Sequence, residues 1–281
     1  MIGSTNIVKD SIKYPFKDYK KFLIFFGIFV LSNLLVLAST CVLTNSFLDL
    51  GNVVDLLRNL ILHQLVANTP LPNLLGGIAI LIVSILVTFL LNGYLYRILE
   101  KSVNNEEELP DFNNIKLLFI QGVKMVLVGL CYAIIPMILI TLSLYNPIAQ
   151  FNGTISGFLL LIGIILSIIF SIIEIMALNY LVANSGKFSS AFEIKEIWAI
   201  LKEVGFIKFI GTIIFSGFIA LIIFLAVVII LAIIGIVIAF IPILRILPLI
   251  VIYLVNYLVY AYFSMYFTRV FGLLYNEREE I

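Results

Sequence analysis

Six long runs of apolar residues, separated by polar or charged segments, dominate the pattern of this chain. They cover residues 22–43, 74–98, 123–145, 156–182, 207–235 and 248–270. A helix needs about 20 apolar residues to cross the hydrocarbon core of a bilayer, so each run is long enough for one crossing. Apolar sequence continues beyond the fifth run to residue 244, and we interpret it as one overlong or tilted helix. The pattern predicts an all-α, polytopic transmembrane helical bundle with six spans, a single integral membrane domain over residues 1–281.

Four further segments place apolar and charged residues on opposite faces of a helix. They cover about residues 5–14, 48–65, 111–122 and 191–204. Such helices typically lie in the headgroup layer of a membrane. We expect the segment 48–65 on the outer surface, whereas each of the other three precedes an odd-numbered span. The sequence therefore predicts three parallel two-span units, each preceded by a cytoplasmic interfacial amphipathic helix.

Positive charge is confined to a few short stretches of the chain. Most of the 17 Lys and Arg residues fall within residues 9–21, 97–124, 187–208 and 269–278. Because short loops rich in Lys and Arg stay in the cytoplasm, we expect an even number of crossings, a location in the cell membrane and both termini in the cytoplasm. With 63% hydrophobic and 12% charged residues, the composition excludes a water-soluble domain. The net charge of +1 gives no indication of nucleic acid as a partner.

Residues that perform catalysis are sparse in this sequence. His63 is the single histidine, and Cys41 and Cys131, the two cysteines, lie inside apolar runs. We find none of the sequence motifs of hydrolases, zinc peptidases or nucleotide-binding loops. We therefore expect a protein that is not an enzyme, with no catalytic residue, no cofactor and no metal site.

Polar residues inside the apolar runs form a candidate intramembrane site. Its members are Glu174, Asn33, Asn92, Asn179 and Asn256. A carboxyl group deep in a span is costly and often marks a proton or cation site, which is the functional hypothesis for Glu174. The competing hypothesis is structural: a protonated Glu174 bonded to one of the asparagines, Arg97 or Arg269 as an ordinary interhelical contact.

Basic residues at the ends of the runs are candidate contacts for lipid headgroups. They are Arg97, Arg269, Lys21, Lys124 and Lys208. Arginine pairs phosphate with two parallel hydrogen bonds, and lysine extends its ammonium group to the headgroup layer. Membrane lipids are therefore the expected partners, together with a possible protein partner at the cytoplasmic face.

Several short stretches resemble one known family. They are Gly93-Tyr94-Leu95-Tyr96-Arg97, Glu106-Glu107-Glu108-Leu109-Pro110-Asp111-Phe112, Gln121-Gly122-Val123-Lys124, Tyr132-Ala133-Ile134-Ile135-Pro136 and the opening Asp10-Ser11-Ile12-Lys13-Tyr14-Pro15-Phe16. This set is similar to domain-of-unknown-function family 4013 (DUF4013), which consists of polytopic, largely archaeal membrane proteins. The resemblance implies a multi-pass protein of the cell membrane and supplies no activity or site residue.

Two functional hypotheses remain. The first is a non-enzymatic membrane protein that binds lipid or a partner, and the scarcity of polar residues in the spans favours it. The alternative is a small-solute or proton-linked carrier that uses Glu174. The two hypotheses differ in whether Glu174 and the asparagines meet in one cavity.

Overall fold

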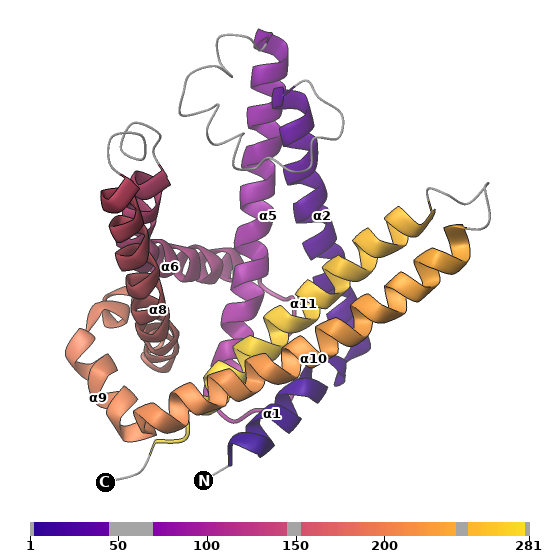
Figure 1. Ribbon diagram of the computed structural model, residues 1–281. Helices are drawn as coiled ribbons and strands as arrows, with labels where there is room; N and C mark the ends of the chain where they lie inside the picture. The colour runs from indigo at the N-terminus through magenta and orange to yellow at the C-terminus, as the bar shows by residue number, and fades with distance from the viewer. Residues whose placement is uncertain (1–2, 45–69, 145–152, 240–246, 279–281) are drawn as a thin grey trace.

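All regular secondary structure in the described part of the chain is helical. The computed structural model describes residues 3–44, 70–144, 153–239 and 247–278. Six of its helices are long and apolar enough to cross a membrane, which confirms the predicted number of spans. These helices are α2 (Tyr19–Thr44), α5 (Leu71–Val103), α6 (Ile115–Leu144), α8 (Gly153–Ala183), α10 (Phe206–Ala239) and α11 (Leu247–Tyr275) (Figure 1).

Shorter helices lie next to the charged ends of the spans. They are α1 (Ser4–Lys13), the 3-10 helix η1 (Tyr14–Phe16), the 3-10 helix η2 (Phe188–Phe192) and α9 (Ile194–Val204). Helix α1 overlaps the predicted segment 5–14, and α9 covers the part of the predicted segment 191–204 that begins at Ile194, whereas the predicted segment 48–65 lies outside the described residues. The location of these helices at a membrane interface stays a prediction.

The predicted helix over residues 111–122 is wrong as a separate element. Helix α6 begins at Ile115, so residues 115–122 form the first turns of a spanning helix and residues 111–114 form a connection. Asn114 sets this start, because its side-chain oxygen accepts the backbone N–H of Leu117 at 3.2 Å. Arg97 meanwhile binds the carbonyl oxygens of Asp111 and Asn113, which keeps the connection out of the helix.

The fifth apolar run forms one helix, as predicted. Helix α10 continues without a break over 34 residues, from Phe206 to Ala239. Gly205 separates it from α9 with a φ of 84°, a left-handed conformation that residues with a side chain rarely adopt. A single glycine therefore lets the chain pass directly from a short helix into a long span.

The spans pack as consecutive pairs that share one end of the molecule. Helix α2 packs along α5, α6 along α8 and α10 along α11, while α5 also packs on α6 and α11. Figure 1 shows the three pairs diverging from a shared lower end, where α1, α9 and both chain termini lie. The buried core lies mainly at this shared end. In α5, for example, most of the buried residues lie between Leu91 and Ser102, at that end.

Helices α5 and α6 cross at two glycines. A Cβ atom on Gly122 would lie 1.7 Å from the carbonyl oxygen of Phe89, and one on Gly93 would lie 1.9 Å from that of Leu118. Atoms that are not bonded do not approach so closely, so the crossing exists only because both positions lack a side chain. Both glycines belong to the stretches that carry the family resemblance.

Candidate functional site

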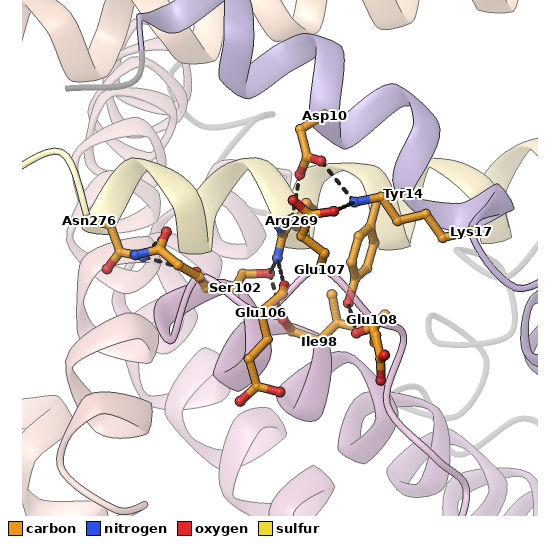
Figure 2. A network of polar contacts seen from close by, with 11 residues as sticks. Asp10, Tyr14, Lys17, Ile98, Ser102, Glu106, Glu107, Glu108, Arg269 and Asn276 are labelled. Atoms are coloured by element: carbon orange, nitrogen blue, oxygen red, sulfur yellow. Dashed lines mark hydrogen bonds and ion pairs between the residues drawn. The ribbon is translucent and has the colours of Figure 1, made fainter.

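Arg269 on α11 is the centre of a polar cluster that joins three segments of the chain. Its Nε donates to Asp10 on α1 at 2.8 Å, and its Nη1 donates to the carbonyl oxygen of Glu106 at 2.6 Å and to the Ser102 hydroxyl at 3.3 Å. The Tyr14 ring lies 4.6 Å from the guanidinium carbon, close enough for a cation–π contact. Figure 2 shows Arg269 between these groups, with Asp10 shared with Lys17. Only 2% of Arg269 is exposed, so the guanidinium belongs to the protein interior.

Arg97 on α5 organises the connection between α5 and α6. Its Nη1 donates to the carbonyl oxygens of Asp111 at 2.7 Å and Asn113 at 2.8 Å, and its Nε donates to the Gln121 side chain at 3.1 Å. The planar fork of five N–H donors makes arginine suited to several acceptors at fixed positions. Arg97 therefore fixes the path of the chain into α6.

The three predicted headgroup lysines also have protein partners. Lys21 binds Asp111 at 2.7 Å and the Leu109 carbonyl oxygen at 2.8 Å. Lys124 donates to the Gly186 carbonyl oxygen at 2.6 Å, and Lys208 pairs with the buried Glu277. These contacts join segments that are far apart in the sequence.

The prediction of headgroup contacts needs a correction at the two arginines. Arg97 is 8% exposed and Arg269 is 2% exposed, so neither presents its guanidinium to the lipid surface. Backbone carbonyl oxygens occupy the donors that a phosphate would use. Headgroup contact stays a prediction for Lys21, Lys124 and Lys208, which are less deeply buried.

The charge pairs shift the pKa values of two carboxyl groups outside the spans. Burial raises the pKa of Asp10, but the hydrogen bonds and charges of Arg269 and Lys17 outweigh it and hold this pKa below its ordinary value of 3.8. A hydrogen bond and the charge of Lys21 lower the pKa of Asp111. Burial also raises the pKa of Tyr14 well above its usual range. Near neutral pH both carboxylates are therefore charged, and Tyr14 keeps its proton to donate to the Glu108 carbonyl oxygen.

Glu174 lies apart from this cluster, in a cavity of about 260 Å³ between α6 and α8. Its Oε1 is beside the backbone of Gly129, where an added Cβ would lie 3.0 Å away. Tyr132, Pro136, Ser167 and Ser171 line the same cavity. Within the described residues no hydrogen bond or ion pair neutralises Glu174.

The predicted asparagines do not join Glu174. Three of them bond to the carbonyl oxygen one turn earlier in their own helix: Asn33 to Phe29, Asn92 to Thr88 and Asn179 to Ile175. Asn256 is exposed on α11. None of the four lines the Glu174 cavity. The structure therefore does not bring the five predicted residues into one site.

Several residues that contact the two arginines had no predicted role. Asp10 and Tyr14 beside Arg269, and Gln121 beside Arg97, lie within stretches that resemble the family, so the resemblance was the available signal. Ser102 had no such signal, because its role depends on Arg269 arriving from the last span. No group of three or more His, Cys, Asp or Glu residues that could hold a metal ion occurs in the described ranges.

Comparison with known proteins agrees with the resemblance. The family described as "Protein of unknown function (DUF4013)" matches residues 76–232, which is more than half of the chain. Neither the curated proteins nor the solved structures include a match. The matched region contains Arg97, the Gly93–Gly122 crossing and Glu174. The chain therefore belongs to the DUF4013 family.

Proposed function

We propose that this protein is a non-enzymatic, multi-pass protein of the cell membrane that binds phospholipids around its helix pairs, with both termini in the cytoplasm. The observation that carries the proposal is how little of the spans is buried within the chain. In the apolar stretches of these helices, only 6% of α8 and of α10 and 17% of α5 is buried within the chain. Soluble monomers rarely expose apolar patches above a few hundred Å². Acyl chains are the natural cover for so much apolar surface.

The lengths of the spans support a tilted arrangement in the bilayer. Helices α5 and α10 contain 33 and 34 residues, well beyond the roughly 20 that a crossing needs. Long helices fit a bilayer by tilting, and the divergence of the pairs in Figure 1 suits such tilts. Lipids then cover the exposed apolar sides of the helix pairs.

Three two-span units remain the favoured organisation. Each of the pairs α2–α5, α6–α8 and α10–α11 consists of consecutive spans, and α1 and α9 precede the first and third pairs. The second pair lacks a separate preceding helix. A parallel repeat of this kind places all three pairs with the same orientation in the membrane.

Helix α9 provides the interfacial contact in this proposal. Its buried face consists of Ile197, Ile200, Leu201 and Val204. On the opposite side Lys195, Trp198 and Lys202 are exposed at a spacing of three and four residues, which places them on one stripe. Tryptophan favours the boundary between headgroups and acyl chains, and lysine favours anionic headgroups. Exposed lysines therefore replace the buried arginines as the expected headgroup contacts.

Native mass spectrometry of the detergent-solubilised protein tests lipid binding. After incubation with equal amounts of phosphatidylglycerol and phosphatidylcholine, we expect the wild type to retain more phosphatidylglycerol. The double variant Lys195→Gln/Lys202→Gln should lose this preference, whereas Glu174→Gln should keep it. Retention of a protein subunit without lipid would contradict the proposal and favour a protein partner at the cytoplasmic face.

A second candidate function is supported by a separate observation. Glu174 lies in a cavity between the spans α6 and α8 and has no neutralising partner among the described residues. An uncompensated carboxylate at such a depth marks a proton or solute pathway by default. A proton-linked carrier would change the pH inside liposomes only when Glu174 is present. Proton flux measured with an internal pH dye, for the wild type beside Glu174→Gln, tests this candidate directly.

A further inference from the structure

The cavity between α6 and α8 combines one carboxylate with an apolar wall. Its lining includes Glu174, Ser167 and Ser171 together with Met137, Ile140 and Phe170. The volume of about 260 Å³ is far larger than a single metal ion needs and suits a small organic molecule. The Glu174 carboxylate lies beside Gly129 on the facing helix, where an added Cβ would lie 3.0 Å from Oε1.

The polar groups of the cavity offer acceptors and lack free donors. The Ser167 hydroxyl donates to the Gly163 carbonyl oxygen at 2.8 Å, and the Ser171 hydroxyl donates to the Ser167 carbonyl oxygen at 2.7 Å. The Tyr132 hydroxyl donates to the Ala191 carbonyl oxygen at 2.7 Å. Each of these protons is therefore already in use, while the serine oxygens and the Glu174 carboxylate retain lone pairs.

A proline leaves a further acceptor without its helical partner on a residue that lines the cavity. Pro136 lies inside α6 and has no N–H, so the carbonyl oxygen of Tyr132, four residues earlier, lacks its helical partner. Both residues line the cavity. The cavity thus provides several acceptors within one small volume, which is the complement of a group that carries several N–H donors and a positive charge.

Aromatic and aliphatic side chains form the rest of the lining. The Tyr132 and Phe170 rings meet edge to face with centroids 6.5 Å apart. Aromatic rings attract cations through their π faces and also cover hydrocarbon groups. A strongly hydrated inorganic ion gains little from such walls, whereas an ammonium group attached to an apolar body matches both parts of the lining.

We propose that the Glu174 cavity binds a small amphiphilic ammonium ion, with the charged group on Glu174 and the apolar body against Tyr132 and Phe170. This inference goes beyond lipid binding. It concerns only the binding of the ammonium ion and does not require that the protein transports it. Glu174 lies nine residues before the end of α8 at Ala183. That distance is about 14 Å along the helix axis. A ligand that enters from the bilayer must therefore be apolar enough to leave the headgroup layer.

Equilibrium dialysis with radiolabelled benzylamine tests the proposal on the full-length protein in detergent. Benzyl alcohol, which has a similar shape and no charge, is the matched ligand control. We expect saturable binding of the benzylammonium ion and binding of the alcohol that is weaker by about tenfold or more, since bonds to a charged group exceed neutral ones. Competition by phosphatidylethanolamine, but not by phosphatidylglycerol, would identify a lipid amine as the natural source. Lack of competition by either lipid would identify a free amine, and both results support an ammonium site.

Three variants separate the site from general effects on folding. Glu174→Gln should weaken benzylammonium binding by about tenfold or more. Ala133→Phe fills the cavity from an exposed position of its lining and should also abolish binding while Glu174 remains. Glu196→Gln removes an exposed carboxylate on α9 and should bind as the wild type does. Equal affinity for the alcohol and the amine, or unchanged binding in a folded Glu174→Gln or Ala133→Phe protein, would overturn the proposal.

Discussion

The crossing of α5 and α6 gives the sharpest prediction of stability. Replacing Gly122 by alanine places a Cβ atom 1.7 Å from the Phe89 carbonyl oxygen and 2.7 Å from the Gly93 nitrogen. Ordinary contacts begin near 3.4 Å, so the two helices must separate locally by about the difference, 3.4 − 1.7 = 1.7 Å. The obstacle is backbone on both sides, and rotation of a side chain does not relieve it.

The cost follows from the contacts that such a separation removes. A gap of about 0.5–1 Å already forfeits a quarter to a half of each dispersion contact, so the displaced crossing loses most of its packing. Overpacking typically costs about 1–3 kcal/mol, and a backbone obstacle belongs at the upper end. Alanine recovers about 1 kcal/mol through its higher helix propensity. We therefore expect a net loss of about 2 kcal/mol in the free energy of unfolding for Gly122→Ala.

Titration with sodium dodecyl sulfate in mixed micelles, followed by circular dichroism, measures this loss. Gly217→Ala is the matched control, because α10 has open space within 4 Å of that Cβ position. We expect the control to unfold at the same or a higher detergent fraction than the wild type. If Gly122→Ala and Gly217→Ala unfold together, the close crossing does not stabilise the fold and the reasoning is refuted.

Three further predictions concern the charged end of the molecule. Asp10→Asn should lower the thermal midpoint at pH 7, where the depressed pKa makes the Asp10 carboxylate stabilising. This difference from the wild type should shrink as pH falls below 3.8 and through the lower pKa of the folded protein. Arg97→Lys should raise the rate of proteolysis within residues 104–114, because an ammonium group lacks the planar fork that holds three acceptors, and mass spectrometry of the fragments checks it. Trp198, the single tryptophan, should be quenched more by lipids brominated near the headgroup than by those brominated near the bilayer centre, and the reverse order would contradict an interfacial α9.

The spans could be predicted because their signal is local. An apolar run of 20 or more residues has few alternatives to a membrane-crossing helix, whatever the rest of the chain does. The same reasoning anticipated a single helix at α10. It failed at residues 111–114, because the start of α6 depends on Arg97, which binds this connection from another helix. Amphipathic spacing alone does not report such a contact.

The candidate site was harder to predict because its partners are mostly backbone atoms. Arg269 binds the Glu106 carbonyl oxygen and Lys124 binds that of Gly186, and every residue carries a carbonyl group. The structural hypothesis paired Glu174 with one of the asparagines, yet an amide in an apolar span can satisfy itself on the carbonyl oxygen one turn earlier, as Asn92 does. Glu174 was named as a candidate because it is an acidic residue inside an apolar run, and its role stays a prediction. Of its companions in the cavity, Tyr132 lies in a stretch that resembles the family, whereas Ser171 has no distinctive sequence pattern.

The position of Arg269 has a consequence for how the protein is made. Asp10, Ser102 and Glu106 all emerge from the ribosome before Arg269, which is 259 residues after Asp10. Until Arg269 is synthesised, the segments that carry Asp10, Ser102 and Glu106 lack the guanidinium group that joins them. Helix pairs inserted early can therefore enter the bilayer separately, and the polar cluster closes only when α11 is complete. A chain that is truncated before α11 would retain its first five spans but would leave the Arg269 partners Asp10, Ser102 and Glu106 without their cation.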